Sequence, residues 1–84
     1  MNVRIGDHAI EHMTPCGITE EEVRKLFNEE ITPFKVQTSD IDDSCVELYA
    51  VLNGKPCKVV YSFVTNTVVT AFSLKGKKWL KYVK

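Results

Sequence analysis

The dipeptide Asn53-Gly54 separates two runs of alternating residues, and no other feature constrains the fold of this chain as strongly. Asparagine followed by glycine readily adopts the positive φ angles of a two-residue hairpin turn. Such a turn places Leu52 opposite Lys55, and counting outward places Cys57 opposite Ala50. The sequence therefore predicts an antiparallel hairpin with a defined register.

From Pro33 onward, β-branched and aromatic residues recur with a period of two, which is typical of strands. We expect four strands, at 34–39, 45–52, 57–65 and 67–74, that form an antiparallel meander. The segment after them alternates lysine with bulky residues, including Trp79 and Tyr82. It is expected to be either a short final strand or a tail docked by its aromatic residues.

Two helices are expected before the strands. The first covers about 7–13, where Ala9 and Met13 lie four residues apart on one face, and Pro15 and Gly17 are expected to end it. The second covers about 20–30 and begins with a capping box. That box pairs Thr19 with Glu22, and the apolar stripe behind it contains Val23, Leu26 and Phe27. The prediction is an α+β fold with two N-terminal helices followed by a four-stranded antiparallel sheet.

Length and composition limit the alternatives. The 84 residues suffice for one domain, and 44% hydrophobic with 26% charged residues is typical of a globular protein, so we expect a single domain over 1–84. No apolar run could cross a bilayer and the N-terminus does not resemble a signal peptide, which favours the cytoplasm and no membrane partner. Three cysteines without a Cys-x-x-Cys pair indicate free thiols, and the hairpin register argues against a Cys45–Cys57 disulfide because it places Cys45 opposite Ser62.

Charge is divided unequally along the chain. Residues 1–47 hold eleven acids and four bases, a formal charge of −7, whereas residues 48–84 hold seven lysines and no acid, a formal charge of +7. Those lysines could line a phosphate-binding surface on which Trp79 and Tyr82 stack with unpaired bases. They could equally protect sheet edges against aggregation. The basic residues in question are Lys55, Lys58, Lys75, Lys77, Lys78, Lys81 and Lys84.

His8 and His12 are the residues best suited to proton transfer, since they lie four apart on one helix face and histidine titrates near neutral pH. The spacing also allows a metal site with Cys16. However, Pro15 and Gly17 are expected to end the helix and no fourth ligand is evident, so we expect no bound metal. Two solvated histidines are the plainer interpretation of the pair.

Several short motifs match, in order and across most of the chain, a family signature. They are His8-Ala9, Met13, Gly17-Ile18-Thr19, Val23 and Val68-Val69-Thr70. On these residues the chain resembles a family of small bacterial proteins of unknown function that is grouped with the RelE, ParE and BrnT toxins. The family has arginine at the positions of His12 and Cys16, and arginine binds phosphate more strongly than either replacement.

The resemblance implies a RelE/ParE-like fold with metal-independent, cofactor-free cleavage of RNA lying across the sheet. Attack of a 2′-hydroxyl on the adjacent phosphate needs proton transfer and cations. The implied base or acid is His8, with His12 as its partner and Thr70 as a hydrogen-bond donor. The phosphate- and RNA-binding candidates are Lys58, Lys75, Lys77, Lys78 and Trp79.

Three functions therefore remain open. The first is an RNA-cleaving, toxin-like enzyme whose partners are RNA and, where one exists, a cognate antitoxin protein. The second is a binding module of the same fold that recognises RNA or protein without cleavage, which the replaced arginines favour. The third is an oligomerising protein with an interface around Trp79, Leu80 and Tyr82.

Overall fold

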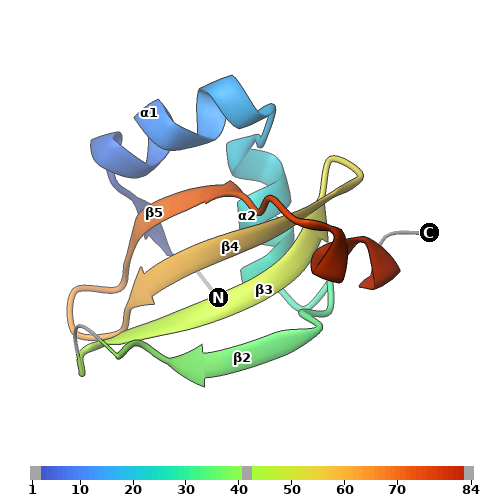
Figure 1. Ribbon diagram of the computed structural model, residues 1–84. Coiled ribbons are helices and arrows are strands. Elements are labelled where there is room, and N and C mark those ends of the chain that lie inside the picture. The colour runs from blue at the N-terminus through green and yellow to red at the C-terminus, as the bar shows by residue number, and fades with distance from the viewer. Residues whose placement is uncertain (1–2, 41–42, 83–84) are drawn as a thin grey trace.

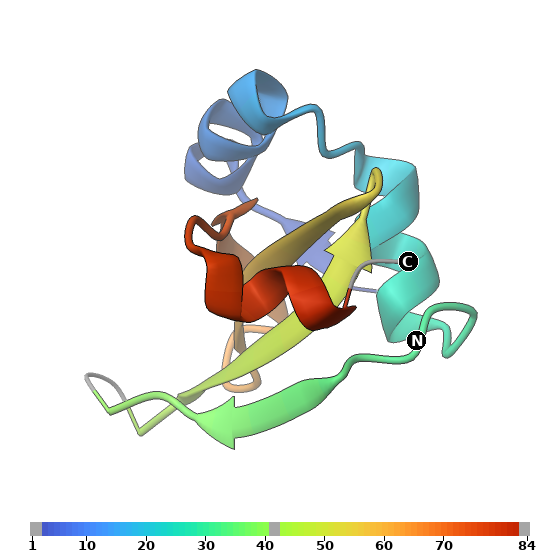
Figure 2. The same ribbon diagram turned by 45° about the vertical axis from the view of Figure 1, so that its right-hand side comes forward.

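The computed structural model of the chain describes residues 3–40 and 43–82. Two helices, α1 (Asp7–Cys16) and α2 (Glu20–Phe27), cover one face of a sheet, and a 3-10 helix, η1 (Lys77–Tyr82), lies on the other side (Figures 1 and 2). The strands are β1 (Arg4–Ile5), β2 (Lys35–Thr38), β3 (Cys45–Leu52), β4 (Lys55–Ser62) and β5 (Thr67–Ser73). The expected α+β class is confirmed.

The prediction of a four-stranded antiparallel sheet is wrong, because the sheet has five strands in the order β1-β5-β4-β3-β2 and is mixed. The added strand β1 runs parallel to β5, with Arg4 opposite Thr67. Two hydrogen bonds hold this segment beside β5, because Arg4 N donates to Asn66 O and Gly6 N donates to Val68 O. A strand of two residues is too short to show any alternation, so the sequence gives no sign of it.

The central hairpin has the register predicted from its turn. Leu52 pairs with Lys55, Ala50 with Cys57, and Cys45 with Ser62. The bounds of β3 match the prediction, whereas β4 begins two residues earlier than expected and ends at Ser62 because residues 63–66 form the next turn. The cysteines are free thiols in this arrangement.

Helix α1 continues three residues beyond its predicted end. Pro15 lies in its last turn, and the helix ends at Gly17, whose φ of 74° lets Ile18 N donate back to Met13 O. Helix α2 begins at the predicted capping box, in which Glu22 N donates to Thr19 Oγ1, but it ends at Phe27 instead of residue 30. In the described part of the chain no helix is long and apolar enough to cross a membrane.

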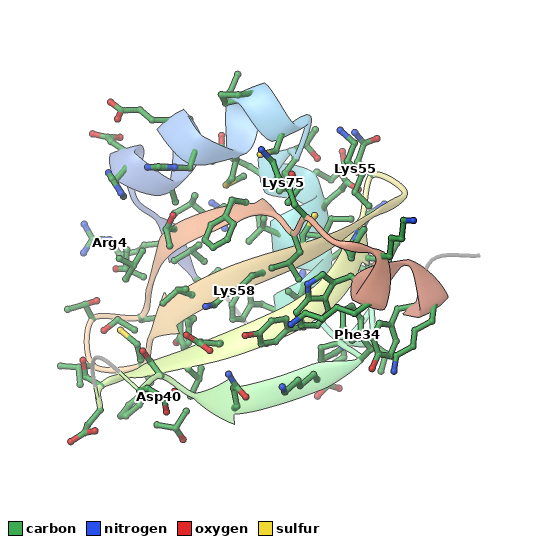
Figure 3. All side chains as sticks on the ribbon, in the orientation of Figure 1. Arg4, Phe34, Asp40, Lys55, Lys58 and Lys75 are labelled. Atoms are coloured by element: carbon green, nitrogen blue, oxygen red, sulfur yellow. The ribbon has the colours of Figure 1, made fainter. Side chains whose placement is uncertain are left out.

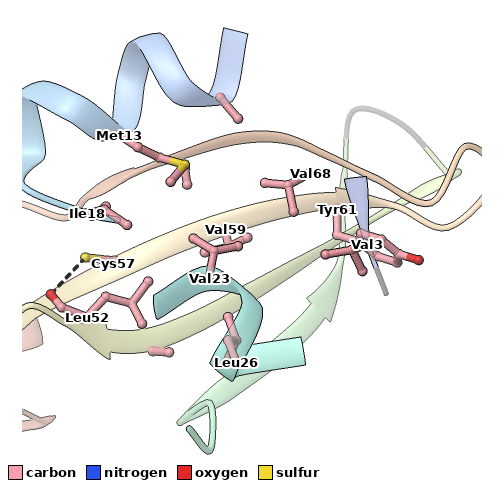
Figure 4. Packing of buried hydrophobic residues seen from close by; sticks show 13 residues of the cluster. Val3, Met13, Ile18, Val23, Leu26, Leu52, Cys57, Val59, Tyr61 and Val68 are labelled. Atoms are coloured by element: carbon pink, nitrogen blue, oxygen red, sulfur yellow. Dashed lines mark hydrogen bonds between the residues drawn. The ribbon is translucent and has the colours of Figure 1, made fainter. Parts of the chain in front are cut away.

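The core lies between the helices and the sheet (Figure 4). Ala9 and Met13 of α1 and Val23 of α2 are fully buried against strand residues such as Val59 and Val68. Burial of a valine or methionine side chain contributes about 1.5–3 kcal/mol. The two predicted apolar helix faces are therefore the ones that hold the helices on the sheet.

Candidate functional site

The sheet face turned away from α1 and α2, here termed the open face, carries an unusual set of polar side chains. Residues alternate along a strand, and the core residues Ala50 and Val59 point toward the helices. Their neighbours Tyr49 and Lys58 therefore point to the open face, where Figure 3 shows Lys58 beside the aromatic rings.

Four of these side chains form a connected network around a buried carboxylate. Glu47 Oε1 accepts hydrogen bonds from Gln37 Nε2 at 2.6 Å and from Tyr49 Oη at 3.2 Å. Its other oxygen lies 3.0 Å from Lys58 Nζ. Only 8% of Glu47 is exposed, so a carboxylate placed here needs all of these partners.

The network changes the proton affinities of its members. The hydrogen bond from Gln37 lowers the pKa of Glu47, and Lys58 adds to that effect against the opposing influence of burial. Burial raises the pKa of Tyr49. Burial is the largest single influence on Lys58 and lowers its pKa, but the hydrogen bonds and charge interactions with Glu47 and Tyr49 together outweigh it, so the pKa is raised. At neutral pH the network therefore contains a carboxylate, an ammonium group and a neutral phenol.

An aromatic cluster of Phe34, Tyr49, Trp79 and Tyr82 covers one end of the open face. The Trp79 ring stacks on Tyr49 with centroids 5.4 Å apart, and Tyr82 stacks on Phe34 at 4.0 Å. Phe34 also lies 6.2 Å from both Tyr49 and Trp79. These contacts dock η1 onto the sheet, so of the two predicted alternatives the structure has the docked tail and not a short final strand. The side chain of Leu80 and residues 83–84 lie outside the described residues.

Lysine ammonium groups lie over the rings of this cluster. Lys78 Nζ is 4.9 Å from the Trp79 centroid and Lys81 Nζ is 5.1 Å from that of Tyr82. Tyr49 has two such neighbours, Lys35 at 5.4 Å and Lys58 at 5.8 Å. The open face therefore combines stacked rings with positive charge.

The predicted catalytic residues do not gather at this cluster. The rings of His8 and His12 are neighbours, as their spacing indicates, with centroids 4.4 Å apart, and both side chains are exposed. They belong to α1, which packs on the opposite side of the sheet. Thr70 pairs with Val60 between core residues, so it points to the open face with Lys58. The structure thus brings Lys58, Lys78, Trp79 and Thr70 onto one face, without the histidines.

Lys75 and Lys77 lie at a second place, where β5 ends near the end of α1. There Cys16 Sγ accepts hydrogen bonds from Ser73 N and Ser73 Oγ, both at 3.5 Å. The described residues contain no group of three or more His, Cys, Asp or Glu side chains placed to hold a metal ion. Cys16 is therefore held by Ser73, and it does not complete a metal site with His8 and His12.

Glu47, Tyr49 and Gln37 did not stand out in the sequence, because an isolated acid or tyrosine in a strand is expected to face solvent. The predicted register was enough to bring Glu47, Tyr49 and Lys58 together. It places Lys58 directly opposite Tyr49, and Glu47 two residues away on the same strand and the same face. Such diagonal neighbours lie within reach of long side chains.

No protein-family model matches this chain, and neither a curated protein nor a solved structure matches it significantly.

Proposed function

We propose that the open face binds single-stranded RNA, as an RNA-binding module of RelE/ParE-like type. The observation that carries the proposal is the stack of Trp79 on Tyr49, flanked by the ammonium groups of Lys35, Lys58 and Lys78. Aromatic rings stack on bases of any sequence, and lysines nearby hold the phosphates between those bases. Tyr49 is buried beneath the stack, so the half-buried Trp79 and the exposed Tyr82 are the rings that would meet a base.

The buried network supports this assignment in two ways. Glu47 is paired with Lys58, so the one carboxylate in the network does not repel a polyanion as a free acid would. Its hydrogen bond with Tyr49 also fixes the ring on which Trp79 stacks. A platform that is rigid before binding loses less conformational entropy when RNA binds.

The matched test compares Trp79→Ala with Phe63→Ala. Phe63 is 55% exposed in the turn between β4 and β5, outside the aromatic cluster. Loss of one base stack costs about 1–3 kcal/mol, so we expect Trp79→Ala to weaken binding of a labelled single-stranded RNA about 5- to 150-fold in fluorescence anisotropy. Phe63→Ala should leave the dissociation constant within about twofold.

Salt gives an independent check of the lysine contribution. Phosphate contacts release counterions, so log K should fall linearly as log salt rises. RNA binding that is absent at low salt, or that Trp79→Ala leaves unchanged, contradicts the proposal. If the protein binds a protein partner instead of RNA, and Trp79→Ala weakens that binding, the open face is the alternative protein-binding module.

RNA cleavage is a second candidate, and the adjacent rings of His8 and His12 favour it. Two imidazoles can act as the proton acceptor and donor of a metal-independent reaction. If the protein is a metal-independent ribonuclease, the purified protein cleaves RNA in the presence of a chelator and His8→Ala abolishes cleavage. Since the histidines lie away from the open face, His8→Ala should leave RNA affinity unchanged. Intact RNA alongside a cleaving positive control would leave only the binding module.

As a toxin, the protein would inhibit growth when expressed and would have RNA and a cognate antitoxin protein as partners. Co-expression with the neighbouring gene tests the second partner. Restored growth supports a toxin, whereas growth that is normal without the neighbour contradicts it.

A further inference from the structure

A groove separate from the aromatic cluster lies where three segments meet. The segments are the turn between β3 and β4, the end of β5 and the start of η1. The groove has a volume of about 510 Å³, within the range of sites that bind small ligands. Its lining residues are Gly54, Lys55, Pro56, Ser73, Leu74, Gly76 and Lys77. Figure 3 shows Lys55 and Lys75 at this end of the molecule, on the side of α1.

The lining is basic and contains no acid. Lys55, Lys77 and Ser73 are among the lining residues, and two glycines leave the backbone accessible. Lys75 follows Leu74 in the same lining segment and adds a third positive charge nearby. Outside the lining, the Glu22 carboxylate accepts a hydrogen bond from Asn53 N in the adjacent turn. The groove therefore favours an anion.

Cys16 lies next to the groove, and the pKa of its thiol reflects the positive charge there. Its Sγ contacts Ser73, and Lys55 Nζ donates to Cys16 O at 3.3 Å. The hydrogen bonds from Ser73 lower the pKa of the Cys16 thiol, and the charges of Lys55 and Lys75 lower it further against the effect of burial. Negative charge is thus stabilised at the rim of the groove.

We propose that this groove binds the phosphate group of a nucleotide-sized phosphate monoester, with Lys55 and Lys77 as its cationic ligands. Charge-assisted hydrogen bonds from lysine are suited to a phosphate dianion. The groove has room for more than the phosphate alone. Such a group is carried by a free mononucleotide or by the terminal phosphate of an RNA chain. Neither case depends on RNA binding by the open face.

The experiment is a titration followed by the amide NMR signals of the groove residues. A nucleoside 5′-monophosphate and the unphosphorylated nucleoside are added to wild type and to Lys55→Gln/Lys77→Gln. Saturable shifts at Gly54, Ser73 and Gly76 are expected with the monophosphate only. An ammonium group about 4 Å from the anion contributes about fivefold in water-like dielectric, so the double variant should bind about 25-fold more weakly.

The control variant is Arg4→Gln/Lys25→Gln, which removes the same charge from β1 and α2. Affinity for the monophosphate should stay within about twofold of wild type. Equal weakening by both double variants would mean that only net charge matters, and this would overturn the site. Equal shifts with the unphosphorylated nucleoside would overturn it as well.

The rate of Cys16 alkylation gives a second test, which does not require a ligand to bind in the groove. The measured quantity is the rate of alkylation by anionic iodoacetate divided by the rate with neutral iodoacetamide. At low salt this ratio should be about fivefold or more higher in wild type than in Lys55→Gln/Lys77→Gln. The nucleoside monophosphate should slow alkylation in wild type. An unchanged ratio of the two rates would contradict the basic groove.

Two further ligands distinguish the sources of the phosphate. Tighter binding of a 5′-phosphorylated tetranucleotide than of the mononucleotide assigns the site to RNA ends, and the reverse assigns it to free nucleotides. Lys35→Gln separates this proposal from RNA binding by the open face, because it removes a cation beside Tyr49 without changing η1 and should leave the monophosphate titration intact. Loss of the titration in that variant would overturn an independent site.

Discussion

Replacement of Glu47 by glutamine tests the network on the open face most directly. The side chain keeps its shape but loses its charge, so Lys58 loses a partner at 3.0 Å. The amide also offers a single acceptor oxygen where the carboxylate offers two. Gln37, Tyr49 and Lys58 then compete for one acceptor.

The size of the effect follows from burial. Hydrogen bonds to charged groups contribute about 1.5–3 kcal/mol, and breaking a buried ion pair costs about 3–5 kcal/mol. Lys58 keeps 23% of its side chain exposed and can recover some hydration, so the loss should fall below the range for a fully buried ion pair. We expect Glu47→Gln to reduce the free energy of unfolding by about 2–3 kcal/mol at pH 7.

The difference should depend on pH with a definite sign. The pKa of Glu47 is lower in the folded state than the value of about 4.3 expected in the unfolded chain. Its contribution is therefore fully present above the unfolded pKa and is lost as the pH falls through the folded pKa. Wild type and Glu47→Gln should differ by a constant amount between about pH 6 and 8 and converge below about pH 4.

Urea denaturation at several pH values measures this difference, and Glu21→Gln is the matched control. Glu21 pairs with Lys25 at 3.6 Å on α2, but its side chain is 79% exposed, so its loss should cost less than about 0.5 kcal/mol. Glu47→Gln/Lys58→Met should recover part of the lost stability, because no unpaired ammonium group remains. A loss below about 0.5 kcal/mol in Glu47→Gln, or one that persists unchanged at pH 3, would refute the reasoning.

Other changes test local features of the fold. Thr19→Ala removes the capping box of α2 and should cost about 1 kcal/mol in thermal or urea unfolding; an unchanged midpoint would show that the cap is redundant. Gly17→Ala forces a side chain into a φ of 74° and within 2.7 Å of Asn53 Nδ2, so we expect a loss of about 1–2 kcal/mol, and full stability would exclude this geometry. Cys16, with its lowered pKa, should be alkylated at pH 7 well before Cys57, which is buried and has a pKa of about 11; mass spectrometry of the partly modified chain checks the order, and preferential loss of the Cys57 thiol would contradict it.

Local signals in the sequence predicted local geometry well. Asn53-Gly54 has few backbone alternatives, so one dipeptide fixed the pairing of β3 with β4. The same holds for Thr19 and Glu22, whose reciprocal hydrogen bonds need only four consecutive residues. The end of α1 was misplaced because Pro15 is compatible with a last turn when Gly17 can close the helix behind it.

The open-face site was harder to predict because its parts come from distant segments. Trp79 and Lys58 were recognised by residue type, but the buried Glu47 that joins Lys58 to Tyr49 was not. The burial of the Glu47 carboxylate can be recognised only once η1 and β2 are placed beside the central hairpin. The contact between His8 and His12 was predicted from their spacing, whereas their separation from the open face depends on which side of the sheet α1 covers.

The pairing of β1 with β5 has a consequence for how the chain folds. Arg4 and Thr67 are far apart in sequence, so closing that contact carries a large loop entropy and raises the contact order of the domain. Helix α1 rests mainly on β5, the last strand to leave the ribosome. During synthesis the apolar side of α1, with Ala9 and Met13, therefore cannot make its native contacts with β5 until that strand has been synthesised.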